Sequence, residues 1–271
     1  HRERVDTALS QNTILRQVTT DNTWNTVSYP LARQLRVQTL EGSTETALDF
    51  RMAALPASAP VEKSWFAQAS FVGDSLTQGM QIYSSGLPEA SFCAYRGANP
   101  SVVVNGTTCK RSDGGTEVPM EVLTARQPPV LYILLGTNTL TTLGAADRFL
   151  AYYGQMLDQL RQALPGCVIY VQSIPPVRPQ AAAEKPGLAS DVLRSVNEQL
   201  AKLAADKGCV YLDLWETFAD ENGNLKEMLA APDGVHFSAG NGYGAWVTYL
   251  RNHAKYSASN SWTMGSAYSA E

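Results

Sequence analysis

Apolar runs and amphipathic stretches alternate along residues 64–256. Five short, β-rich apolar runs predict strands at residues 70–72, 91–95, 130–135, 168–172 and 210–214. Between them, apolar positions recur at helical spacing, most clearly over residues 145–164 and 188–207, and a glycine follows each of these stretches (Gly166 and Gly208). A last helix is predicted over residues 239–253. This alternation favours an α/β fold in which helices cover both faces of a parallel sheet.

The first 60 residues follow a different pattern. They are rich in Thr, Gln and Asn, show weak periodicity, and end in a Pro/Ala/Ser segment over residues 55–60 that is typical of a linker or an extended arm. Residues 35–40 alternate apolar and polar and predict one strand. We therefore expect an N-terminal extension of unknown role over residues 1–63, a folded domain over 64–256 and a polar tail over 257–271.

Composition excludes several classes of protein. The 271 residues carry a net charge of −4 without a basic cluster, so no nucleic-acid partner is expected. No apolar run approaches the roughly 20 residues that span a bilayer. The three histidines and four cysteines lack metal-ligand spacing, so neither a metal nor a cofactor is expected. The chain opens with His1 rather than methionine, which fits a processed or trimmed form.

Five candidate functional residues follow the predicted strands. Ser75 follows the first strand, Gly97 the second and Asn138 the third, and Asp233 and His236 follow the fifth. In an open parallel sheet, the loops at the carboxyl ends of the strands share one edge, where ligands bind. We therefore expect these five residues to lie close together.

A serine hydroxyl becomes a good nucleophile only when a base takes its proton, and an acid often orients that base. His236 is the one histidine with an acid close by in a motif, Asp233. His1 is terminal, and His253 is predicted to be an exposed cation at the end of the last helix. Elimination thus selects Ser75, His236 and Asp233.

Four sequence blocks resemble those of the GDSL, or SGNH, hydrolases. The segment Gly73-Asp74-Ser75-Leu76 matches the signature of that family, and Gly97 resembles the glycine of its second block. Gly136-Thr137-Asn138 resembles the third block and Asp233-x-x-His236 the fifth. The resemblance covers roughly residues 64–256. Thr139 departs from the family, where many members have aspartate after the asparagine.

The resemblance implies a three-layer α/β/α sandwich with a five-stranded parallel sheet in the flavodoxin-like order. It also implies hydrolysis or transfer of an ester-linked acyl group. Ser75 would be the nucleophile, His236 the general base and then acid, and Asp233 the orienting carboxylate. The backbone N–H groups of Ser75 and Gly97 and the Asn138 amide would form the oxyanion hole. Asp74 is expected only to bond its own turn.

The leading functional hypothesis is a serine esterase for small acyl esters, such as acetyl groups on carbohydrate. Short loops without a long apolar lid favour an open, shallow site; the longer ones span residues 97–116 and 175–187. An O-acyltransferase or a lysophospholipase on the same triad remains an alternative. So does a catalytically silent module that binds a glycan or a lipid. The expected partner is a small-molecule or carbohydrate ester.

The four cysteines predict two disulfide bridges. Cys167 and Cys209 open the fourth and fifth strands, which are neighbours in the flavodoxin-like order. Cys93 and Cys109 bracket the loop that carries Gly97. Bridges would favour an extracellular or cell-surface location. Four reduced cysteines, the alternative, would leave a cytoplasmic location open.

Overall fold

The computed structural model describes residues 54–254 throughout. Before them it describes four short strands, β1 (Leu15–Gln17), β2 (Trp24–Val27), β3 (Leu35–Gln38) and β4 (Thr46–Leu48). β1 pairs with β4 and β2 with β3, both antiparallel. The strand predicted at residues 35–40 is β3, and its last two predicted residues lie outside the described residues, as does the predicted tail over 257–271.

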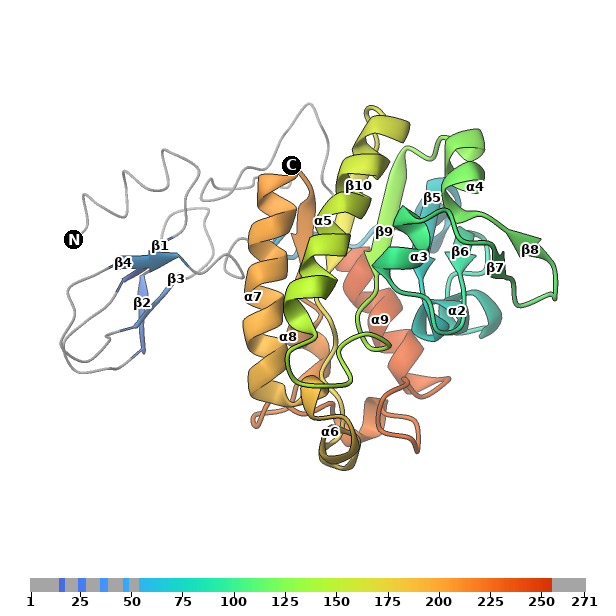
Figure 1. Ribbon diagram of the computed structural model, residues 1–271. Helices are drawn as coiled ribbons and strands as arrows, with labels where there is room; N and C mark the ends of the chain where they lie inside the picture. The colour runs from blue at the N-terminus through green and yellow to red at the C-terminus, as the bar shows by residue number, and fades with distance from the viewer. Residues whose placement is uncertain (1–14, 18–23, 28–34, 39–45, 49–53, 255–271) are drawn as a thin grey trace.

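A five-stranded parallel sheet forms the centre of the described α/β unit (Figure 1). Its strands are β5 (Ala69–Gly73), β6 (Ser91–Ala94), β9 (Val130–Leu134), β10 (Val168–Gln172) and β11 (Val210–Leu212). They lie in the order β6-β5-β9-β10-β11, and every neighbouring pair is parallel. Counted along the chain, this is the order 2-1-3-4-5. The predicted fold class and strand order are confirmed.

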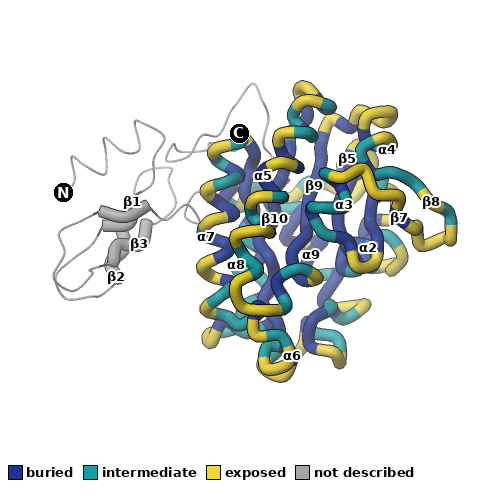
Figure 2. Tube along the Cα trace, in the orientation of Figure 1, coloured by how far each residue is buried: buried dark blue, intermediate teal, exposed yellow. Residues whose placement is uncertain are grey.

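Helices cover both faces of this sheet. One face packs against α3 (Pro100–Val104), α5 (Ala146–Ala163) and α7 (Ser190–Asp206), and the other against α2 (Ser75–Ile82) and α9 (Asn241–Asn252). The three long predicted helices are thus confirmed with slightly shorter bounds. The remaining helices are short: α4 (Pro119–Arg126), α6 (Pro179–Glu184) and α8 (Trp215–Phe218), with 3-10 turns at Lys63–Gln68, Pro186–Leu188 and Glu227–Leu229. Figure 2 shows the strands buried between the two helical layers.

The strands are buried on both sides because their side chains alternate between two apolar cores. On the α9 face, four aromatic rings form a row across β6, β5, β9 and β10. Phe92 stacks on Phe71 at 5.3 Å between ring centroids, Phe71 on Tyr132 at 4.9 Å, and Tyr132 on Tyr170 at 4.6 Å. We call these four residues the aromatic row.

The segment over residues 54–61 packs on the α/β unit. Leu55 is fully buried, and its N–H donates to the Tyr211 carbonyl of edge strand β11 (2.9 Å). The Ser58 N–H donates to the Asn252 carbonyl at the end of α9 (2.7 Å). This packing begins upstream of residue 64, where the sequence places the start of the folded domain. The division into extension, domain and tail stays a prediction.

The predicted disulfides are wrong, because all four cysteines are free and buried. Tyr170 pairs with Val210, so the position opposite Cys209 is residue 169, two residues beyond Cys167. Arg161 also enters this region and donates to the Cys167 carbonyl (2.8 Å). The Cys109 thiol instead donates to the Thr107 carbonyl (3.4 Å). The cysteines therefore give no reason to place the protein outside the cytoplasm.

The expectation that His253 is an exposed cation is also wrong. His253 directly follows α9, as expected, but it is only 5% exposed. Its ring stacks on Tyr249 at 3.8 Å between centroids, and its Nδ1 donates to the Tyr249 carbonyl (2.7 Å). Its Nε2 lies 3.7 Å from the Glu216 carboxylate. Tertiary packing over the helix end buries the ring.

Candidate active site

Ser75 lies at the junction between β5 and α2. Asp74 is the N-cap of α2, and its Oδ1 accepts a hydrogen bond from the Leu76 N–H (2.9 Å). The capping function that serine often serves is therefore filled by Asp74, and Ser75 is the first residue of the helix. Gly73 permits this tight turn, because an added Cβ would overlap the Thr77 side chain. The Ser75 side chain is half-buried.

His236 reaches Ser75 from the other end of the chain. Its Nε2 lies 2.8 Å from Ser75 Oγ, and its Nδ1 lies 2.5 Å from Asp233 Oδ2. An ionised carboxylate only accepts hydrogen bonds, so Nδ1 carries the proton toward Asp233 and Nε2 can accept from the serine. The three side chains form one continuous chain of hydrogen bonds.

Asp233 is held by its own loop. Its Oδ1 accepts from the backbone N–H groups of Val235 (3.0 Å) and His236 (2.9 Å). Partial burial raises the pKa of the Asp233 carboxyl, but the hydrogen bonds from the His236 side chain and backbone outweigh it and leave the pKa below its ordinary value. Asp233 is therefore ionised at neutral pH, as an orienting carboxylate must be.

Gly97 lies in a tight turn after β6. The Ala98 N–H donates to the Tyr95 carbonyl (3.0 Å), and Gly97 has a φ of +77°, which favours glycine. Gly73 pairs with Ala94 across β5 and β6, so the loops that carry Ser75 and Gly97 leave adjacent strands at the same edge. Gly97 itself is exposed at that edge.

Asn138 links the loops that follow β5, β6 and β9 through hydrogen bonds. It follows β9, and its Nδ2 donates to Asp74 Oδ2 (2.9 Å) and, more weakly, to the Ala98 carbonyl (3.4 Å). The structure thus brings Asn138 to the two loops that carry Ser75 and Gly97. All five residues selected from the sequence gather at the carboxyl edge of the sheet.

The sequence did not reveal the second role of Asp74. Besides capping α2, its Oδ2 accepts from Thr137 Oγ1 (3.0 Å) and from Asn138, and the residue is 1% exposed. Burial raises the pKa of the Asp74 carboxyl to about 6, although the hydrogen bonds from Leu76 and Thr137 act in the opposite direction. The position of Asp74 directly before Ser75 was the available sequence signal for a role in the site. Its contact with Asn138 could not be predicted, because the folded sheet brings these two residues together.

Within residues 54–254, no group of three His, Cys, Asp or Glu side chains could hold a metal ion. None of the helices in the described part of the chain is long and apolar enough to cross a membrane.

The α/β/α fold and the hydrogen bonds that link Ser75, His236 and Asp233 at its edge fit a serine hydrolase. A family model described as the GDSL-like lipase/acylhydrolase family matches residues 71–243. The chain belongs to this family and is accordingly a serine hydrolase that acts on ester bonds. A search among curated proteins found no match.

Solved structures with the same fold include two from Bacteroides. A GDSL-like lipase from Bacteroides thetaiotaomicron is 15% identical, with a TM-score of 0.50 over 72% of this chain and 88% of the other. A protein from Bacteroides fragilis assigned as an acylhydrolase is 16% identical, with a TM-score of 0.51 over the same shares of the two chains. At this identity the likeness shows the fold alone.

Proposed function

We propose that this protein hydrolyses small acyl esters through an acyl-enzyme on Ser75. The observation that carries the proposal is the hydrogen-bonded chain from Asp233 through His236 to Ser75. His236 Nε2 would take the Ser75 proton as Oγ attacks the ester carbonyl. It would then give that proton to the departing alcohol. In the second half, His236 would activate a water that releases the acid.

The negative charge that develops on the carbonyl oxygen needs hydrogen-bond donors. The N–H of Ser75 belongs to the first turn of α2, where backbone donors have no intrahelical partner. The Gly97 N–H and the Asn138 amide are the other proposed donors. The longer of the two Asn138 hydrogen bonds, to the Ala98 carbonyl, is the one that could turn toward the substrate.

Small acyl groups, acetyl among them, are the proposed substrates because the catalytic residues lie in an open site. The side chains of His236 and Asp233 are 40% and 52% exposed, so this side of the site is open to solvent. Carbohydrate is the proposed alcohol part.

The test is burst release of nitrophenol from 4-nitrophenyl acetate by wild type, Ser75→Ala, His236→Ala and the double variant. Ser75→Ala should remove the burst without unfolding the protein, because losing one hydroxyl on a turn opens no sizeable cavity. Each single variant should lose nearly as much activity as the double variant, since the two residues act as a unit. Activity of Ser75→Ala within tenfold of wild type, or losses that multiply independently, would contradict the proposal.

An acyltransferase would use the same acyl-enzyme with a sugar hydroxyl in place of water. Addition of sugar acceptors to the nitrophenyl acetate assay, with mass spectrometry of the products, separates the two activities. Esters of increasing acyl length in the same assay test the preference for small acyl groups against a lysophospholipase activity. A silent binding module would give no burst at all.

A further inference from the structure

A cleft of about 770 Å³ opens beside Gly97. Its walls come from α2, from the turn after β6, from α3 and from the segment over residues 107–112. Gln78 contributes from α2, three residues after Ser75, so the two lie on neighbouring positions of one helix face. The cleft therefore adjoins the proposed oxyanion hole and has a volume typical of ligand-binding sites.

The lining of this cleft combines cationic and polar side chains with apolar ones such as Ile82 and Val102. It contains Arg96, Lys110 and Arg111 but no carboxylate side chain. Its uncharged polar groups come from Gln78, Tyr95, Thr107, Thr108, Cys109 and Ser112. The whole chain has a net charge of −4, so an anion would be repelled by the protein at large and attracted to this cationic lining.

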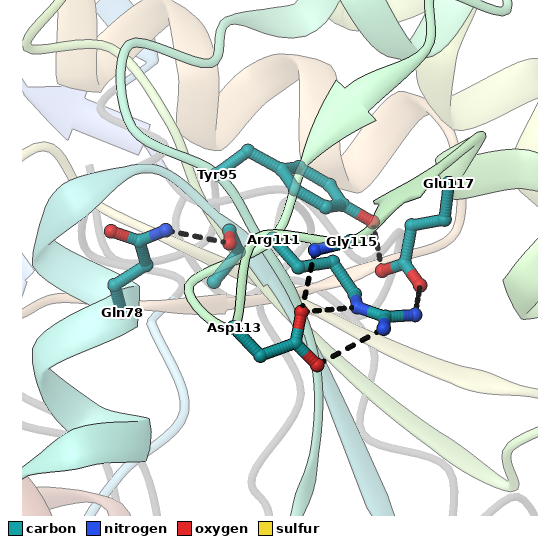
Figure 3. A network of polar contacts seen from close by, with 7 residues as sticks. Gln78, Tyr95, Arg111, Asp113, Gly115 and Glu117 are labelled. Carbon is teal, nitrogen blue, oxygen red and sulfur yellow. Dashed lines mark hydrogen bonds and ion pairs between the residues drawn. The ribbon is translucent and has the colours of Figure 1, made fainter.

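A network of polar contacts holds one wall of the cleft in place (Figure 3). Arg111 donates to both Asp113 carboxylate oxygens (3.0 Å each) and to Glu117 Oε2 (3.3 Å). The Tyr95 hydroxyl donates to Glu117 Oε1 (2.8 Å), which ties the hairpin of β7 (Cys109–Lys110) and β8 (Thr116–Glu117) to the Gly97 turn.

Arg96 and Lys110 differ from Arg111 in their surroundings. Both are exposed, and within the described part of the chain neither has a carboxylate at ion-pair distance. The charge of Arg111 is already balanced by Asp113 and Glu117. Arg96 also directly precedes Gly97. Two cations without a carboxylate partner in the described part of the chain thus line a cleft next to the proposed reacting centre.

We infer that this cleft binds the alcohol part of the ester through an anionic group, carboxylate or phosphate, held by Arg96 and Lys110. The inference rests on the proposed function: a small acyl group needs no cleft of this size, so the alcohol part is the one that fills it. The hydroxyls and the amide of the lining suit a hydroxylated alcohol. The substrate class is therefore an acylated acidic carbohydrate.

The test compares matched acetate esters whose alcohol part is charged or neutral. The pairs are 4-acetoxybenzoate with 4-acetoxybenzamide, and 4-acetoxyphenyl phosphate with its neutral dimethyl phosphate ester. Wild type should favour the charged member in kcat/KM, and the preference should shrink as ionic strength rises. Arg96→Gln and Lys110→Gln should each reduce the charged-to-neutral ratio roughly two- to fivefold. The pair that shows the larger preference identifies carboxylate or phosphate.

Lys202→Gln is the matched control, because it removes one exposed positive charge on α7, which packs against β11 at the opposite edge of the sheet from β6. It should leave the ratio unchanged. Equal kcat/KM values within both pairs for wild type, or an equal effect of Lys202→Gln, would overturn the inference while the esterase function stands. A preference for mono-4-nitrophenyl succinate over 4-nitrophenyl butyrate, with none for the alcohol-side anions, would overturn the alcohol assignment.

A binding measurement separates this inference from the proposed function. Ser75→Ala should bind uncleaved 4-acetoxybenzoate more tightly than 4-acetoxybenzamide, and Lys110→Gln in that background should reduce the difference roughly two- to fivefold. This result is expected even if none of the esters is hydrolysed. Equal affinity for the two compounds would refute the anionic cleft.

Discussion

Asp74 should make the folding stability of this protein depend on pH in a direction opposite to that of most carboxylates. Burial raises its pKa in the folded protein to about 6 from its ordinary value of 3.8. At pH values between these two pKa values, the native state therefore binds a proton at Asp74 more tightly than the unfolded chain does. It follows that the contribution of Asp74 to the free energy of unfolding rises as the pH falls.

The magnitude follows from the same pKa. At about pH 7.5 the carboxyl is ionised in both states and contributes nothing pH-dependent. At about pH 5, one unit below the folded-state value, protonation stabilises the native state by about 1.4 kcal/mol. Other carboxylates act in the opposite direction, Asp233 among them with its lowered pKa. The difference between wild type and a variant is therefore the informative quantity.

Asp74→Asn is the matched variant because it keeps the side-chain volume and an oxygen for the Leu76 N–H. Urea unfolding followed by tryptophan fluorescence at the two pH values gives four free energies of unfolding. Wild type should gain about 1.4 kcal/mol on Asp74→Asn when the pH falls from about 7.5 to about 5. Parallel behaviour of the two proteins, or a gain by the variant, would refute the reasoning about Asp74.

Other residues give sharp expectations of their own. Asn138→Ala should lower kcat by roughly 10²–10³ with a smaller effect on KM, because an oxyanion donor acts mainly in the transition state; steady-state kinetics that show a change in KM alone would contradict this role. Gly79→Ala should destabilise the fold by about 1–3 kcal/mol in urea unfolding, since its Cβ would overlap the Tyr243 hydroxyl that donates to the Leu76 carbonyl. Gly244→Ala on α9, where a Cβ meets nothing within 4 Å, should instead stabilise by up to about 1 kcal/mol, and a loss of stability there would count against the α9 packing. Thiol titration of the unfolded, unreduced protein should find four thiols, and fewer would restore a predicted bridge.

Sequence patterns predicted the sheet well because four of its five strands, β5, β9, β10 and β11, are almost fully buried. Such strands appear as continuous apolar runs, and the parallel arrangement places the loops that follow them at one edge. The serine, histidine and aspartate could be selected because histidines are scarce and because Asp233 lies only three residues from His236. These signals are local in sequence or depend only on strand direction.

The features that could not be predicted from the sequence depend on strand register and on tertiary contacts between distant segments. The Cys167–Cys209 bridge was predicted because the two cysteines open neighbouring strands. The register of these strands offsets the two cysteines by two residues, so they do not lie opposite each other. Helical periodicity placed His253 at a helix end without showing that Glu216 and Tyr249 lie over it. The bond between Asp74 and Asn138 joins loops that are 64 residues apart in the chain.

The aromatic row has a consequence for how the chain folds. Parallel strands pair residues that are far apart in sequence, and such pairing forms slowly. The entropy cost of closing the long connecting loop comes before any stabilising contact between the strands. A slip of one residue in β5 or β9 would send Phe71 or Tyr132 to the opposite face and break the stacking on both sides of that ring. The row therefore penalises misaligned intermediates while the sheet is still assembling. Correct alignment at β5 and β9 in turn brings the loops after these two strands together.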